Sequence, residues 1–99
     1  MAILIDTAMW PWRDWLWCHM ISDTSVDELK EFAEKLGIPE RGFQGDHFDI
    51  PEHMRDVAIA HGATVVTTRE ILQALYSAGM RLKPAQRHGR PADVPIHQP

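Results

Sequence analysis

Three residues able to do chemistry lie within four positions of a short polar segment: Asp46, His47 and Asp49. In an extended backbone, alternate side chains point to the same side, so His47 and Asp49 would share one face. Such a pair can hold a proton or a divalent metal ion. A histidine held by a carboxylate also titrates near neutral pH, which suits general acid–base catalysis. These three are therefore the candidate catalytic residues.

A histidine with two carboxylates suits Mn²⁺, Fe²⁺ or Zn²⁺, provided that other ligands come from elsewhere in the chain. Asp6 ends an apolar run and His19 lies inside a second one, and both are suppliers of the right type. The expected metal ligands are His47, Asp49, His19 and Asp6, and the expected cofactor is a divalent ion, Mn or Zn. Two alternatives stay open. In the first, the cluster holds no metal and either binds a ligand or does acid–base chemistry. In the second, the residues are structural: Asp49 caps the next helix and His47 bonds to the backbone.

Four tryptophans lie between positions 10 and 17. They either form a small apolar core that fixes the first long loop, or present a wall on which a planar ring stacks. The candidate ligand-binding residues are Trp10 and Trp17 as the wall, His19 as a polar contact, and Arg41, Arg55 and Arg69 as anion contacts. Arg69 is expected in the first turn of a helix, beside free backbone amides. Surface ion pairs are the alternative role for each arginine.

Short apolar runs that alternate with helical repeats position these residues. Strands are expected over residues 2–5, 16–21 and 63–67, with a short one around Phe43 or Phe48, and an ordered loop over 7–14. Helices are expected from residue 26 to Gly37, from Pro51 to Gly62, and from residue 68 to about Met80, with capping boxes at Ser25–Glu28 and Thr67–Glu70. The alternation favours an α/β domain with a small, largely parallel sheet of three or four strands and about three helices.

Ligands of an open α/β sheet bind outside the carboxyl ends of its strands. The residues that follow the expected strands are Asp6, Ser22 and Asp23, segment 46–49, and segment 67–69. Parallel strands would bring all of them to one rim of the sheet, whereas antiparallel pairing of the first two strands would move Asp6 away from the others. We expect the site at this carboxyl rim.

The composition limits the class of protein. The chain has 99 residues, of which 44% are hydrophobic and 24% charged, as in an ordinary single globular domain. Residues 1–79 hold 13 acidic and 6 basic side chains, which opposes binding to duplex nucleic acid. Residues 80–99 are basic and rich in proline, so we expect one domain over 1–82 and an extended tail over 83–99.

No apolar run is long enough to span a membrane, and no signal peptide is visible at the start. The single cysteine, Cys18, forms no internal disulfide and agrees with a cytoplasmic location. We expect Cys18 to be a small buried hydrophobic residue. A small-molecule ligand is the expected partner, and a protein partner or a homo-oligomer stays open.

Several short strings occur together between residues 2 and 82: Ile3-Leu4-Ile5-Asp6, Trp10-Pro11, Leu16-Trp17-Cys18-His19, Ser22-Asp23, Arg41-Gly42-Phe43, Gly45-Asp46-His47-Phe48-Asp49-Ile50-Pro51-Glu52 and Gly62-Ala63. In combination they resemble a family of small bacterial and phage proteins known only as a domain of unknown function. The resemblance implies a shared fold. It also implies that the family pattern includes Asp6, Trp10, Trp17, His19, Asp23, Arg41, Asp46, His47, Asp49 and Arg55.

Some members of that family are joined to, or encoded beside, a metal-dependent phosphohydrolase domain, which points towards nucleotides or phosphate esters. Such phosphohydrolases use an adjacent His-Asp pair, whereas the order here is Asp46-His47, so their chemistry is not carried over.

We therefore expect a small cytoplasmic α/β domain that binds a compact polar ligand, nucleotide-like or phosphorylated, at the carboxyl rim of its sheet, with or without turnover. One alternative is a metal-dependent hydrolase that uses the His/Asp cluster. The other is a non-enzymatic bacterial or phage protein-interaction module.

Overall fold

The computed structural model describes residues 2–7 and 10–81, and the predicted tail over 83–99 lies outside them. In the described part of the chain, the strands are β1 (Ile3–Ile5), β2 (Trp10–Trp12), β3 (Trp15–Ser22), β4 (Phe48–Pro51) and β5 (Thr64–Val65). The helices are α1 (Val26–Lys35), α2 (Glu52–Ala60) and α3 (Thr68–Ser77), with a 3₁₀ turn, η1, at Glu40–Gly42. The three helices and the mixed α/β class are as predicted.

The five strands form one mixed sheet around β3. One edge of β3 pairs with β4, and the other edge pairs first with β2 and then with β1, all antiparallel. Only the pairing of β1 with β5 is parallel among the described strands. The prediction of a largely parallel sheet was therefore wrong.

The turn between β2 and β3 explains this difference. Arg13 and Asp14 both have positive φ angles, 51° and 70°, so two residues reverse the chain as in a type I′ hairpin turn. Asn-Gly and Asp-Gly are the usual residues there, and Arg13-Asp14 does not resemble them. Part of the segment predicted to be a loop is consequently β2, and the hairpin makes β3 antiparallel.

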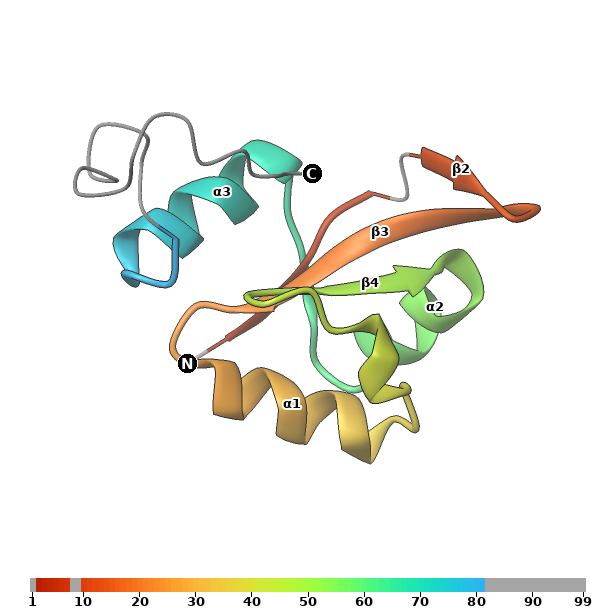
Figure 1. The fold of residues 1–99 in the computed structure, drawn as a ribbon, viewed down its shortest axis with the longest axis horizontal. Coiled ribbons are helices and arrows are strands. Elements are labelled where there is room, and N and C mark those ends of the chain that lie inside the picture. Colours follow the sequence, from red (N-terminus) through yellow and green to blue (C-terminus); the bar gives the residue numbers. More distant parts are fainter. Residues whose placement is uncertain (1, 8–9, 82–99) are drawn as a thin grey trace, which may run out of the picture.

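The helices lie on both faces of the sheet (Figure 1). Helices α1 and α2 cover one face, where Cys18 and Met20 of β3 join the larger core with Phe48 and Ile50 of β4. Helix α3 lies on the opposite face and packs on Ile21. Because side chains alternate along a strand, His19 shares this second face with Ile21.

The hairpin end of the second face is open. Trp12 is 53% exposed there and Trp15 is 50% exposed, so these two rings are not part of a buried core. The edge strand β5 is also more exposed than predicted, with Val65 at 47%. It is shorter than the expected strand because only Thr64 and Val65 pair with β1.

Helix ends follow local capping chemistry. Ser25 accepts the backbone N–H of Glu28 at the start of α1, and Thr67 forms the complete capping box with Glu70 at the start of α3. Helix α2 begins after Pro51 without a side-chain cap. Asp49 therefore does not cap that helix, and this alternative role for it is excluded. None of the described helices has the length and apolarity needed to cross a bilayer.

Candidate metal centre

The sheet brings three candidate ligands together: His19, His47 and Asp49. One donor atom from each lies within 4.8 Å of the others. His19 of β3 and Asp49 of β4 are direct cross-strand partners. His47 precedes Asp49 by two residues, and its Nε2 atom lies 3.2 Å from Oδ1 of Asp49. The prediction that His47 and Asp49 share one face is confirmed.

A break in the sheet positions His19. Ile5 pairs with Met20 and Trp10 pairs with Trp17, so the regular pairing along this edge of β3 stops at Met20 and resumes at Trp17. At this break Asp6 is fully buried, and its carboxylate accepts the backbone N–H of His19 at 2.7 Å. The strand pairing alone, without any metal ion, therefore places the carboxylate of Asp6 beside His19.

The same carboxylate also orients the imidazole ring. Nδ1 of His19 donates to Oδ2 of Asp6 at 2.7 Å, and the hydroxyl of Thr68 donates to that oxygen at 2.8 Å. Burial alone would raise the pKa of Asp6. The hydrogen bonds from His19 and Thr68 outweigh burial and hold that pKa below its usual value. Asp6 is thus a charged hydrogen-bond acceptor behind the ring of His19.

His47 has an equivalent arrangement. Its Nδ1 donates to Oδ1 of Asp46 at 2.7 Å. Arg81 holds Asp46 with two bonds, 2.8 Å from Nε and 2.9 Å from Nη2. Burial opposes the charge on Asp46, but His47 and Arg81 together lower its pKa to about 2. Asp46 therefore acts through the ring of His47.

On each histidine these contacts leave Nε2 as the nitrogen that could bind a ligand, and on His47 it already lies 3.2 Å from Oδ1 of Asp49 as an ion pair. A metal-binding histidine usually donates its other N–H to a carboxylate, which fixes the ring. Burial would lower the pKa of His47, but Asp46 and Asp49 outweigh it and raise the pKa to about 9. Oδ1 of Asp49 is buried and accepts no hydrogen bond from the described residues. A cation between these atoms would satisfy it.

A small pocket of about 170 Å³ opens beside the cluster. Its lining residues are His19, His47, Thr68, Ile71, Leu72, Leu75 and Arg81. The ring of Trp10, which does not line this pocket, packs on His19 with its centroid 4.6 Å from that of the imidazole. The cluster is therefore partly enclosed, yet open to a compact ligand.

Other predicted residues lie further away. Asp6 was predicted to be a metal ligand, but it lies outside the group of three donor residues. It bonds instead to His19, which is one of the three. Arg55 donates from Nε to the backbone carbonyl of Asp6 at 3.0 Å and so helps to hold the break in the sheet. Arg69 is exposed at the start of α3 and does not line the pocket.

The expected rim is only partly correct. Asp6 and the start of α3 do meet, because β1 and β5 are parallel. Ser22 and Asp23 lie at the opposite end, because β3 is antiparallel to β1 and Ser22 pairs with Ile3. There Asp23 accepts the backbone N–H of Ala2 at 2.8 Å.

Sequence reasoning missed two supporting residues, Thr68 and Arg81. Thr68 was expected at the carboxyl rim and in a capping sequence but without a contact to Asp6, and Arg81 was counted with the basic residues of the tail. A hydroxyl or guanidinium that bonds to a distant carboxylate leaves no local pattern, so neither contact has a signal in the sequence.

Cys18 is confirmed as a buried residue. It is fully inaccessible, and burial raises the pKa of its thiol to about 12. Its side chain points to the face opposite His19. It therefore has no part in the cluster.

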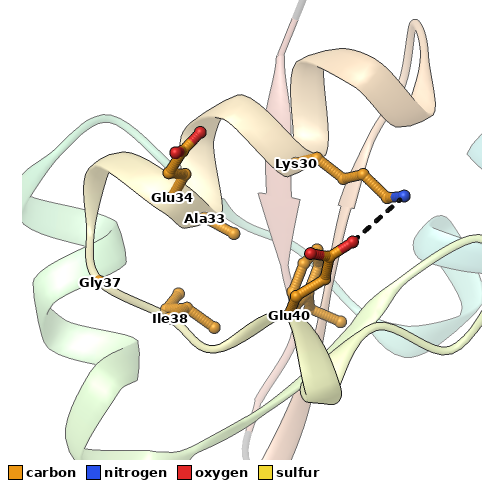
Figure 2. A pocket seen from close by; sticks show the side chains of 7 residues that line it. Lys30, Ala33, Glu34, Gly37, Ile38 and Glu40 are labelled. Atoms are coloured by element: carbon orange, nitrogen blue, oxygen red, sulfur yellow. Dashed lines mark ion pairs between the residues drawn. The ribbon is translucent and has the colours of Figure 1, made fainter.

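A larger pocket, of about 460 Å³, lies between α1 and η1. Figure 2 shows Lys30 and Glu40 reaching toward each other there, with 3.8 Å between their charged atoms. Lys30 also lies 4.5 Å above the ring of Phe43. Because these charges are already engaged, the pocket offers less chemistry than the cluster.

The comparisons with known proteins agree with the sequence resemblance. Residues 3–78 match the model of one family, described as a protein of unknown function (DUF4031). No curated protein and no solved structure matches the chain.

Proposed function

Because the chain belongs to the DUF4031 family of proteins of unknown function, we propose its function from the geometry of the site. A divalent ion, zinc or manganese, binds to His19, His47 and Asp49 and activates water to hydrolyse a compact phosphorylated ligand. One observation carries the proposal. Each histidine directs Nδ1 to a carboxylate, and one donor atom each from His19, His47 and Asp49 lies within 4.8 Å of the others.

The number of ligands favours a reactive site over a structural one. Structural zinc sites have four protein ligands, whereas catalytic sites have three and leave a position for water or substrate. A divalent ion held by one carboxylate and two neutral histidines keeps a net positive charge. That charge attracts an anionic group, and the adjacent pocket of about 170 Å³ admits a small one.

Each residue has a definite role in this reaction. An ion held by His19, His47 and Asp49 would supply hydroxide by lowering the pKa of a bound water to about 7. Attack of that oxygen on phosphorus would break the ester P–O bond, and the departing oxygen would take a proton from the solvent, which receives the proton lost by the water. Asp6 and Asp46 keep the imidazoles of His19 and His47 oriented. Both are therefore positioning residues in this proposal, and Asp46 is not catalytic. Trp10 shields the ring of His19.

Metal binding is the first test. Protein purified without chelator is analysed for metal content, and metal-free protein is titrated with Zn²⁺ and Mn²⁺ by calorimetry. We expect one ion per chain, and a loss of affinity of at least 100-fold in His19→Ala, His47→Ala and Asp49→Ala. His61→Ala is the matched control, because His61 is exposed and, among the described residues, its ring bonds only to the carbonyl of Val57 in the preceding helix. Protein that contains no metal and ignores both ions would refute the centre.

Hydrolysis is tested separately with p-nitrophenyl phosphate and bis(p-nitrophenyl) phosphate. We expect metal-dependent release of nitrophenol that disappears in His47→Ala and persists in His61→Ala. Two histidines and a carboxylate also bind Fe²⁺ in oxygenases. A protein that carries only iron and releases no nitrophenol would therefore keep the metal centre and overturn the hydrolase.

A further inference from the structure

A second pocket, of about 250 Å³, adjoins the metal centre from the hairpin side. Among its lining residues are Trp15, Trp17, Arg41, Asp49, His53 and Met54. Asp49 belongs both to this lining and to the group of metal-binding residues. The pocket and the proposed metal centre therefore share one carboxylate, that of Asp49.

One wall of this pocket is aromatic. The indole of Trp17 is fixed, because its Nε1 donates to the carbonyl of Trp12 at 2.8 Å. The ring centroid of Trp15 lies 5.9 Å from that of Trp17 and 4.7 Å from that of His53, edge to face with His53. Half of the surface of Trp15 remains exposed. A preformed and partly exposed wall of this kind suits the stacking of a planar ring.

The same pocket holds an unengaged cation. Arg41 lies in η1 and is exposed. It makes no hydrogen bond or ion pair with any residue of segments 2–7 and 10–81. Its five N–H donors are therefore available to a ligand, and a guanidinium matches the oxygens of a phosphate group. The aromatic wall and Arg41 together favour a ligand that has a planar ring and an anionic group.

We infer that this pocket binds the planar ring of a phosphorylated ring compound of nucleoside monophosphate size, with Arg41 on its phosphate. The ring lies against Trp15 and Trp17, and the phosphate lies on Arg41, in the pocket that Asp49 also lines. The inference deepens the proposed function, because the ion at Asp49 would then face the same phosphate. The volume suits one compact ligand, since it lies just below the range of drug-sized sites.

The probes are adenosine monophosphate, adenosine, which lacks the anion, and ribose 5-phosphate, which lacks the ring. Binding to the full chain is measured in EDTA, which prevents turnover, by tryptophan fluorescence and by NMR shifts of the indole N–H signals. We expect the monophosphate to bind at least tenfold more tightly than either fragment. The signals of Trp15 and Trp17 should shift more than that of Trp12.

Two variants separate the two contacts. Arg41→Ala should weaken monophosphate binding about tenfold and leave adenosine unchanged, because it removes one charged hydrogen-bonding partner. Trp15→Leu should weaken both, and Trp15→Phe, which keeps a ring, should retain most of the affinity. The matched control for the arginine is Arg69→Ala, because Arg69 is exposed and lies outside the pocket lining.

The result is independent of the metal proposal. Equal affinity for the monophosphate and ribose 5-phosphate, or equal effects of Arg41→Ala and Arg69→Ala, would overturn the inference. Zn²⁺ titrations of Arg41→Ala and Trp15→Leu should match the wild type, which also shows that these variants are folded. Monophosphate binding without any metal binding would uphold the pocket and refute the centre, and the reverse pattern would refute only the pocket.

Discussion

His19 and Asp6 are joined twice: the backbone N–H of His19 donates to one carboxylate oxygen of Asp6, and its ring Nδ1 donates to the other, each at 2.7 Å. In the first bond the carboxylate takes the place of a backbone carbonyl as the acceptor for the N–H of His19, because the pairing of β1 with β3 ends at Ile5. The ring bond fixes the tautomer and leaves Nε2 for a ligand. One buried carboxylate thus ends a strand pairing and orients a functional side chain.

Asp6→Asn tests this double role. Asparagine keeps an acceptor for the backbone N–H of His19 but removes the negative charge behind the ring. We expect a loss of Zn²⁺ affinity of about 10- to 100-fold, as for other residues that support a metal ligand. Calorimetry measures the affinity, and circular dichroism checks the fold. Asp23→Asn is the control, because Asp23 caps Ala2 at the far end of the sheet. Wild-type affinity in Asp6→Asn would show that the ring needs no anionic partner.

Arg81 contacts the proposed metal centre through Asp46, the carboxylate that orients His47. Arg81→Gln removes the positive charge from a carboxylate that is only 13% exposed. We expect Zn²⁺ affinity to fall by about threefold to tenfold, less than for the carboxylates themselves, because Arg81 is one contact further from the ion. Arg81→Lys should recover part of this loss. Full affinity in Arg81→Gln would mean that Asp46 holds His47 unaided.

The helices could be predicted because their signals are local. Leu29 and Ala33 recur at helical spacing and are both buried, and the Thr67–Glu70 capping box formed as predicted. Strand direction could not be predicted in the same way. It depends on the positive φ angles of Arg13 and Asp14, and the sequence has no Asn-Gly or Asp-Gly there to predict such a turn.

The metal cluster was predictable by residue type but not by role. His19, His47 and Asp49 were all named from the sequence, and cross-strand pairing of His19 with Asp49 brings them together. Asp6 was expected to be a ligand, yet it lies behind His19 because the break in the sheet turns its carboxylate to that residue. Assigning this role requires the register of the strands.

Cys18 should be inert in the folded protein. It is completely buried and its pKa is raised to about 12, so almost no thiolate exists at pH 8. We expect labelling by a chromogenic disulfide reagent to be at least 100-fold slower in the native protein than in urea. Rapid native labelling would contradict the packing of β3 against β4.

Residues 84–99 should be dispensable for metal binding. Every ligand and every supporting partner described for the cluster lies between Asp6 and Arg81. A chain truncated after Lys83 should bind Zn²⁺ with wild-type affinity in calorimetry. Loss of Zn²⁺ binding on truncation would show that the tail contributes to the centre. The same truncation tests the protein-interaction alternative, in which the tail is needed to capture a partner while the metal centre is untouched.

The pH dependence of stability provides a test that needs no substrate. In metal-free protein the pKa of His47 is about 9, against an ordinary value of 6.5. The folded state therefore holds this proton more tightly than the unfolded state. The resulting stabilisation is complete below pH 6.5 and is lost as the pH rises through 9, and it is on the order of 3 kcal/mol. Urea unfolding in EDTA at pH 6.5 and pH 9.5 measures it. His47→Gln should abolish most of the difference, and His61→Ala should preserve it.

Zn²⁺ should reverse this trend, because the ion binds only the neutral imidazole and competes with the proton. At a fixed Zn²⁺ concentration we expect the added stability to increase between pH 6.5 and pH 8.5 in the wild type and to be absent in His47→Gln. A metal-induced stabilisation independent of pH would mean that the ion is bound elsewhere than at His47.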